Sequence, residues 1–318
     1  MEWKRPDVIR PPLPGYALQI KHAWKSQSEQ TYLLTGDEHW DSPECYLKLL
    51  CQHLEECGQR NGLWISNGDL WDAISSRDDQ RGSKGTLREE HCKVDYLDQL
   101  VDDAIDTFRP YLGMLVYIGT GNHEQKIRIK KETDLTARFC EKANAIRKES
   151  GIGPIHRAGY AGAIRFQFNI YGTARLSHSM WLQHGNNSGP VTKGTIGANR
   201  RAAAVHGMSL YVTSHIHEQW CLSNTIIRLN DSTGRIEQHD AQHVQLGSYK
   251  GDFRTDGEPT WYTMMTGGSS PKPIGGSWLR FYAPTGRRVK FEVTPTDVDY
   301  PNLLDYLAKP HVGKRRAA

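Results

Sequence analysis

The sequence lacks several features that would assign it to a simple class of protein. No apolar run approaches the roughly 18 residues that a membrane-spanning helix needs. The first residues carry charges and prolines but no apolar stretch of the kind that directs secretion. Neither an internal repeat nor a low-complexity linker is present. We therefore expect an intracellular, cytoplasmic protein that has one main domain and no membrane partner.

Charge and cysteine content also give few constraints. The formal net charge is only +4, which is compatible with an anionic partner but does not require one. None of the 6 cysteines forms a Cys-x-x-Cys pair, so we expect reduced, mostly buried thiols. The length of 318 residues, with 37% hydrophobic and 24% charged residues, is typical of a globular protein with a substantial core.

Short apolar runs alternate with helical patterns, and several of these runs end in Gly-Asp or Gly-Asn. We predict an irregular lead-in at residues 1–30, a main domain at 31–300 and a basic tail at 301–318. The predicted strands are residues 31–35, 63–66, 114–118, 163–171, 174–183 and 210–213. The predicted helices are residues 43–60 (with Ser42 as N-cap), 87–108, 134–149 and 198–206. Residues 75–85 and 185–197 are predicted loops.

Residues that can bind metal follow many of these apolar runs. In a sheet flanked by helices, ligands gather at the carboxyl ends of the strands. Carboxylates and amides mixed with imidazoles suit Mn, Fe, Ni, Co or Zn better than Mg or Ca. The candidates are too many for one ion, and two ions that share a carboxylate are the usual arrangement for displacement at phosphorus. In chain order the pieces are Asp37-Glu38-His39, Gly68-Asp69, Gly121-Asn122-His123-Glu124, His184, and His215-Ile216-His217.

This ordered set resembles the pattern of the calcineurin-like metallophosphoesterase family, which runs D-x-H, GD-x-x-D, GNH-D/E, a lone H, and GH-x-H. The match extends over about residues 31–220, with Asp72 as the second Asp of the second piece. The resemblance implies a four-layer α/β sandwich, in which two mixed sheets pack face to face with helices outside. It also implies hydrolysis of phosphate esters by a hydroxide that bridges two divalent ions. Manganese is favoured, with iron, zinc, nickel, cobalt or magnesium as alternatives.

The resemblance further assigns roles to single residues. His123 would protonate or hydrogen-bond the leaving-group oxygen instead of binding metal, and Asp72 would orient His123. The predicted ligands are Asp37, His39 and His217 for one ion, Asn122, His184 and His215 for the other, and Asp69 as the bridge.

The fourth piece has a competitor on the same predicted strand. His178 lies six residues before His184, so both would face the same side of the strand. We favour His184 because it ends the strand and is followed by Gly185.

The chain also departs from the family pattern in two places. Ser214 stands where the family has glycine, and a positive φ there would cost serine more than glycine. Ala73-Ile74 follow Asp72 where the family's protein Ser/Thr phosphatases carry Arg-Gly, so we do not expect a phosphatase of that kind.

Basic residues indicate the class of substrate. If the stretch after the third piece is extended, Lys126, Arg128 and Lys130 share a side and could meet phosphates near the metals; a solvated charged loop is the alternative. Arg200, Arg201 and the tail would offer further contacts to a nucleic-acid backbone. We predict a phosphodiesterase or nuclease acting on DNA, RNA or nucleotides. A phosphomonoesterase of small substrates and a non-catalytic scaffold of the same fold remain alternatives.

Three tryptophans lie within three residues of a predicted ligand. They are Trp40, Trp71 and Trp181. We expect each to pack in the core, with stacking on a base as the alternative.

Overall fold

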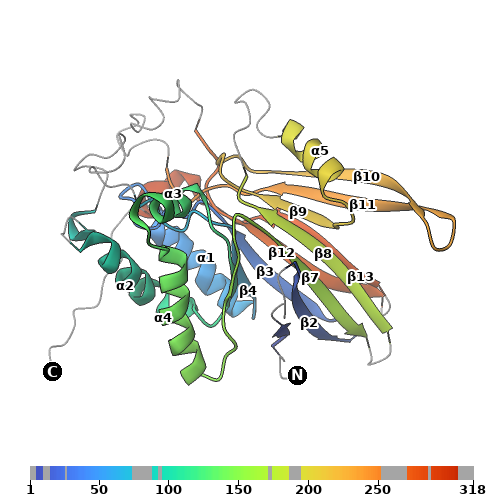
Figure 1. Ribbon diagram of the computed structural model, residues 1–318, viewed down its shortest axis with the longest axis horizontal. Helices are drawn as coiled ribbons and strands as arrows, with labels where there is room; N and C mark the ends of the chain where they lie inside the picture. The colour runs from blue at the N-terminus through green and yellow to red at the C-terminus, as the bar shows by residue number, and fades with distance from the viewer. Residues whose placement is uncertain are drawn as a thin grey trace.

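Two mixed β-sheets pack face to face, and helices cover the outside (Figure 1). The structure is a computed structural model that describes residues 5–9, 15–25, 27–73, 88–91, 95–170, 174–185, 195–251, 271–285 and 288–306. The predicted arrangement of two mixed sheets flanked by helices is confirmed. Helices α1, α2 and α4 lie on one outer face, and in the described part of the chain the opposite outer face carries the single helix α5.

The 6-stranded sheet has the order β13-β12-β3-β4-β5-β6. Its strands β3, β4, β5 and β6 run parallel to one another, so their carboxyl ends meet at one edge. The two remaining strands add to it antiparallel. The bounds are β3 Glu29–Thr35, β4 Leu63–Ser66, β5 Leu115–Ile118, β6 His156–Arg157, β12 Ser277–Thr285 and β13 Arg288–Pro295.

The 7-stranded sheet has the order β1-β2-β7-β8-β9-β11-β10. Strands β8 and β9 are parallel neighbours, so they too deliver their carboxyl ends to a common edge. Strands β10 and β11 form a long hairpin that extends away from helices α1, α2, α3 and α4 (Figure 1). The bounds are β1 Asp7–Ile9, β2 Leu18–Trp24, β7 Ala161–Ile170, β8 Ala174–Gln183, β9 Leu210–Thr213, β10 Trp220–Asn230 and β11 Arg235–Gln245.

Five α-helices and three short 3-10 turns are present in the described residues. The α-helices are α1 Leu47–Gln59, α2 Tyr96–Phe108, α3 Asn122–Lys131, α4 Leu135–Glu149 and α5 Thr195–Ala204. The 3-10 turns are η2 Glu89–His91, η3 Arg109–Tyr111 and η4 Tyr300–Tyr306.

Three predicted helix starts were wrong. Helix α5 already begins at Thr195, within the predicted loop 185–197. Helix α1 begins at Leu47 with Tyr46 as its N-cap, because the N–H of Tyr46 donates to the carbonyl of Tyr249 (2.8 Å) and holds the preceding backbone out of the helix. The hydroxyl of Ser42 instead accepts the N–H of Glu44 (3.3 Å) in a turn. Helix α2 begins only at Tyr96, since the short turn η2 precedes it.

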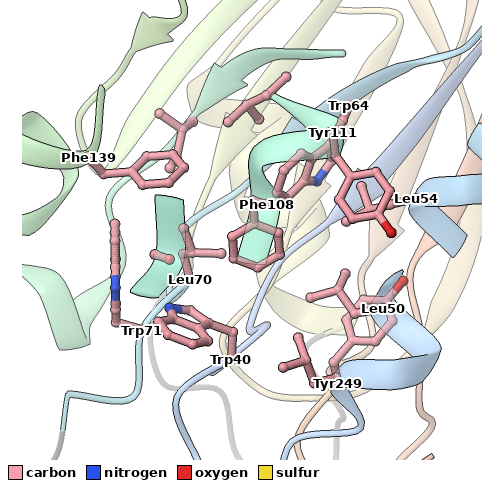
Figure 2. Packing of buried hydrophobic residues seen from close by; sticks show 14 of the residues in the cluster. Trp40, Leu50, Leu54, Trp64, Leu70, Trp71, Phe108, Tyr111, Phe139 and Tyr249 are labelled. Atoms are coloured by element: carbon pink, nitrogen blue, oxygen red, sulfur yellow. The ribbon is translucent and has the colours of Figure 1, made fainter. Parts of the chain in front are cut away.

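Alternate residues of the central strands face two different cores. In β3, Leu33 packs toward the helices, whereas Tyr32 and Leu34 pack against the other sheet. This strand is buried on both faces, as expected for a strand with layers on each side. The helix-side core is rich in aromatic residues, and Trp40 and Trp71 both lie in it (Figure 2).

The chain ends differ in part from the prediction. Residues 1–30 are not simply irregular: they contain β1 and β2, and β2 pairs with both β1 and β7 inside the 7-stranded sheet. Of the predicted basic tail, residues 307–318 lie outside the described residues, as do the predicted loop 75–85 and residues 186–194 of the other loop. The described cysteines are free thiols. Among the described helices, none combines the length and apolarity needed to cross a membrane.

Candidate metal centre

The carboxyl ends of the two sheets meet at Asn67, which follows β4. Its N–H donates to Thr35 of β3 (2.8 Å), and its side-chain amide donates to the carbonyl of Gln183 in β8 (3.1 Å) and to the hydroxyl of Ser214 (3.0 Å). Its own carbonyl accepts from Nδ1 of His184 (3.0 Å). One residue therefore links the segments that carry the predicted ligands of both sheets.

Asp37 lies at the middle of the cluster and is fully buried. Its Oδ1 lies 3.9 Å from Nε2 of His39, 3.8 Å from Nε2 of His184 and 3.6 Å from Nε2 of His217. These distances are too long for hydrogen bonds, and Oδ1 has no hydrogen-bond partner among the described residues. Atoms that bind one ion at about 2.0–2.2 Å lie about 3–4 Å from one another, so this spacing fits a shared cation.

His184 contacts two further predicted ligands, Asp69 and Asn122. Its Nε2 lies 3.0 Å from Oδ2 of Asp69 and 3.0 Å from Oδ1 of Asn122, which is the first residue of α3. Because Nδ1 donates to a carbonyl, Nε2 is the nitrogen left to face these oxygens. The competing residue His178 points elsewhere: its Nε2 contacts the carbonyl of Val289, 3.0 Å away.

Three overlapping groups of side chains could each hold an ion, with ligand atoms within 4.8 Å of one another. Asp37 and Asp69 each belong to two of the groups. The carboxylate of either residue could therefore be shared by two ions. His123 also belongs to one group, so geometry alone does not separate its predicted catalytic role from a ligand role. The groups are Asp37, Asp69, His184 and His215; Asp37, His39 and His217; and His39, Asp69 and His123.

Five of the predicted ligands have left-handed backbone conformations. Such conformations are rare for residues with a Cβ, cost free energy, and cluster at functional sites. In these five ligands they occur after strands end, where the backbone must turn each side chain back toward the centre. The residues and their φ values are Asp37 (51°), His39 (45°), Asp69 (55°), His215 (82°) and His217 (55°).

Ser214, the departure from the family pattern, causes no such strain, because it is not among the residues with positive φ. Its hydroxyl lies 3.1 Å from Nδ1 of His184 and so helps to orient that ring. Space for it comes from Gly36, where a Cβ would stand 2.9 Å from the Cβ of Ser214. The serine is thus accommodated by the absence of a side chain at residue 36.

The N-terminus of α3 packs directly against the Gly68-Asp69 turn. The N–H of His123 donates to Oδ1 of Asp69 (2.9 Å), which places a carboxylate at the helix end that favours negative charge. The buried Glu124 accepts the N–H groups of Asp69 (3.1 Å) and Gly121 (2.7 Å). A Cβ at Gly121 would lie 2.0 Å from Oδ1 of Asp69, so only glycine allows this approach.

The carboxylate of Asp72 lies between two imidazoles and a lysine. It stands 3.0 Å from Nδ1 of His39 and 3.7 Å from Nδ1 of His123, whose closer contact is the main-chain carbonyl of Asp72 (2.5 Å). The ammonium of Lys250 donates to both oxygens of Asp72, at 2.9 and 3.0 Å. The carboxylate therefore has a full countercharge and contacts both histidines.

Sequence analysis missed Lys250, and it also missed Asp41, whose carboxylate accepts the N–H of Asp72 (2.6 Å). Lys250 follows β11, far along the chain from the motifs, and only the folded arrangement brings it to Asp72. Asp41 stands two residues after His39, and no sequence pattern pointed to it.

The buried carboxylates favour positive charge at the centre. Burial acts to raise the pKa of Asp69, but His184 and His123 outweigh it and hold the pKa well below its usual range. Burial acts to lower the pKa of His184, but Asp69 is the first of the groups that raise it, to about 10. Cations bind imidazole in its neutral form, so a metal ion would take the place of this proton.

The basic stretch after the third motif is not extended, contrary to one of the two predicted arrangements. It forms helix α3, in which Lys126 and Lys130 share a face with His123, whereas Arg128 points to another side and lies 3.9 Å from Asp134. Arg128 and Lys130 are exposed, and Lys126 is half-buried. The helix forms because Glu124 accepts the N–H of the N-cap residue Gly121.

Comparison with known proteins gives no family assignment. The sequence matches no known protein-family profile and no curated protein. Solved structures that match include GAP50, the anchor in the inner membrane complex of Plasmodium, with 10% identity, 87% of this chain and 93% of that chain covered, and a TM-score of 0.38. A metallophosphoesterase from Sphaerobacter thermophilus matches with 12% identity, 84% and 90% coverage, and a TM-score of 0.31. At these values neither likeness carries an argument about family or activity.

Replacement of Lys250 by methionine should destabilise the fold. It would leave the carboxylate of Asp72, which is 3% exposed, without its countercharge. Breaking a buried pair from one side costs about 3–5 kcal/mol. We expect a loss of that size in the free energy of unfolding, measured with urea, and a partial recovery when Asp72→Asn is added.

Lys142→Met is the matched control for this measurement. Lys142 forms an ion pair with Asp102 in which the side chains are 46% and 57% exposed. Its loss should cost less than about 1 kcal/mol. Equal losses of unfolding free energy for Lys250→Met and Lys142→Met would show that the buried pair with Asp72 stabilises the fold no more than an exposed ion pair does.

Proposed function

We propose that this chain is a two-metal phosphoesterase of the calcineurin-like metallophosphoesterase type. The observation that supports this most is the convergence of carboxylates and imidazoles from the ends of strands in both sheets, with Oδ1 of Asp37 buried and unpartnered among the described residues. Carboxylate and imidazole ligands in one buried cluster suit divalent transition metals. Structural ion pairs do not require so many imidazoles around a single oxygen.

The residues present fit two ions in their donor chemistry. Asp37, His39 and His217 would hold one ion, Asn122, His184 and His215 the other, and Asp69 would contact both. Two such ions supply a nucleophilic water at neutral pH and neutralise charge on the phosphate. Manganese is the ion we favour.

The chain itself orients the imidazoles. Nδ1 of His39 lies 3.0 Å from the carboxylate of Asp72, which attracts that ring without a well-aligned hydrogen bond. His184 donates Nδ1–H to the carbonyl of Asn67, so its ring is fixed with Nε2 directed at Asp69. A second hydrogen bond of this kind fixes the tautomer and raises the basicity of a metal-binding imidazole. The ligand geometry is therefore held by the protein before any ion arrives.

His123 is the proposed general acid. Its Nδ1 donates to the main-chain carbonyl of Asp72, which leaves Nε2 to protonate the leaving-group oxygen. Its position at the start of α3 places Lys126 and Lys130 on the same helix face, three and seven residues further on. On this face the two cations would contact the leaving portion of a substrate, and this supports the proposal of a phosphodiester, such as DNA, RNA or a nucleotide, over a monoester.

Replacement of His184 should remove metal, whereas the same replacement of His178 should not. We expect the wild-type chain to retain two divalent ions after dialysis, His184→Gln to retain at most one, and His178→Gln to retain two. The reason is that His184 faces Asp69, whereas His178 packs among Phe168, Phe281 and Phe291. Metal content is measured by mass spectrometry of the dialysed proteins. Equal metal content in the two variants would refute the proposed site.

His123→Ala should reduce turnover without loss of metal. A positioned general acid contributes typically about 10²–10⁴-fold, so we expect a fall of that size on a diester with a poor leaving group and a smaller fall with nitrophenolate. Turnover and metal content are measured on the same samples. A drop to one ion per chain would instead make His123 a ligand, in line with its place in the third group of side chains.

The substrate class is tested with a panel of chromogenic monoesters and diesters and with single- and double-stranded DNA and RNA, each with Mn, Ni, Co or Mg. We expect diesters to be hydrolysed faster than monoesters. On polymers, affinity should fall with salt with a log–log slope of roughly −0.7 to −0.9 per contacted phosphate. Activity on monoesters alone would favour the phosphomonoesterase. No turnover with both ions bound would favour the non-catalytic scaffold.

A further inference from the structure

Helix α5 lies over the outer face of the 7-stranded sheet (Figure 1). A second polar cluster lies on that face, where Arg201 of α5 contacts Thr213 of β9. The parallel register of β8, β9 and β11 places Trp181, Tyr211 and His243 in one row across three strands. The next row holds Thr213 and Gln245. The rings of Tyr211 and His243 stack, with centroids 4.5 Å apart and planes 4° apart. These side chains face away from the apolar core that lies between the two sheets.

Arg201 of α5 reaches down onto this face. Its guanidinium folds back along the helix, so that a Cβ at Gly197 would lie 3.2 Å from its Nη1. Its Nη2 donates to the hydroxyl of Thr213, at 3.5 Å. That hydroxyl lies 2.8 Å from Oε1 of Gln245 and donates to it. The guanidinium is thus held against the sheet and not extended into solvent.

Several polar atoms of this cluster are buried and have no hydrogen-bond partner within the described part of the chain. They are Nε of Arg201, Nε1 of Trp181, and both ring nitrogens of His243. The ring of His243 is almost fully covered, with 1% of the residue exposed. A buried polar group left unpaired is costly, and the unpaired N–H groups of Arg201 and Trp181 on this face indicate a missing acceptor.

The donor groups of the cluster favour binding of an anion. Guanidinium and indole N–H groups donate hydrogen bonds and do not accept them, so they cannot bind a cation. Burial lowers the pKa of Arg201, and no carboxylate of the described residues is close enough to offset that effect. Burial, followed by the charge of Arg201, lowers the pKa of His243. A guanidinium covered in this way without a countercharge is unfavourable until an anion arrives.

We propose that Arg201, His243 and Trp181 form an anion subsite that binds a phosphate group of the substrate other than the one hydrolysed. Thr213, which the guanidinium touches, stands two residues before His215, and two residues of extended chain span about 7 Å. The subsite therefore lies beside the metal centre, at the end of the same strand. Its role in catalysis rests on the proposed phosphoesterase function, whereas its ability to bind an anion does not.

A second phosphate beside the metal centre defines the substrate more closely. A small monoester has only one phosphate and would leave Arg201 unused. A dinucleotide or a polynucleotide has successive phosphates and would place one at each position. The subsite thus supports a substrate of at least two linked phosphates, read through its backbone and not through its bases.

The binding test uses metal-free, chelator-treated protein and inorganic phosphate as the probe, with isothermal titration calorimetry as the measurement. We expect wild type to bind phosphate and Arg201→Gln to bind it about tenfold more weakly or worse, since one charge-assisted hydrogen bond is lost. Arg235→Gln is the matched control: Arg235 is an exposed arginine at the start of β11, and the change in net charge is the same. Its affinity should stay within about twofold of wild type.

Two further variants keep the test decisive if Arg201→Gln fails to fold, as judged by circular dichroism. Arg201→Lys keeps the cation and should retain most of the affinity. Trp181→Phe keeps the ring, removes one donor, and should weaken binding several-fold. Wild type that binds no phosphate, or Arg201 variants that bind as wild type does, would overturn the subsite and leave the proposed function standing.

The catalytic test compares the metal-loaded variants on two substrates. Arg201→Gln should raise KM for a short oligonucleotide more than for bis(p-nitrophenyl) phosphate, which has a single phosphate, whereas Arg235→Gln should raise neither. An equal rise on both substrates would overturn the assignment of a second phosphate to this cluster. Hydrolysis of no ester at all, with Arg201-dependent phosphate binding intact, would support the anion site and overturn the phosphoesterase function.

Discussion

The hydrogen bonds of Asn67 join the ends of the two sheets, and the candidate metal centre depends on that connection. Its side chain donates to Gln183 and Ser214, and its carbonyl accepts from His184. Apolar packing between the sheets stabilises the sandwich but is not directional, so it does not by itself set how one sheet end lies against the other. The directional contacts of Asn67 do so, and they bring imidazoles of the 7-stranded sheet to the carboxylates of the 6-stranded sheet.

The features that are local in sequence were predictable. Strands β3, β4 and β5 are short runs buried on both faces, and such runs are recognisable from composition. Each is followed within a few residues by a possible ligand, so parallel pairing is enough to bring Asp37, Asp69 and Asn122 to one edge. The preference for His184 over His178 also rested on a local feature, the glycine that follows the end of the strand.

The features that depend on contacts between distant segments were not predictable. Lys250 reaches Asp72 only because the chain after β11 crosses to the other sheet, where Tyr249 donates its N–H to the carbonyl of Asp37 (3.1 Å). The row of Trp181 and His243 requires the register of three strands. Helix α3 was not predicted from the sequence. The many charges after Glu124 favoured an extended segment or a loop, whereas Glu124 caps a helix by accepting the N–H of Gly121.

The left-handed turns at the ends of the strands restrict which residues can occupy them. Aspartate, asparagine and histidine tolerate a positive φ several-fold better than other residues with a Cβ. At Asp37, His39 and Asp69 the backbone and the coordination chemistry therefore select the same few amino acids. An alanine at one of these positions would tolerate the positive φ less well and would also remove a metal ligand. The resulting loss of stability would combine a conformational cost with lost coordination. Asparagine or glycine, which keep the turn, would separate the two contributions.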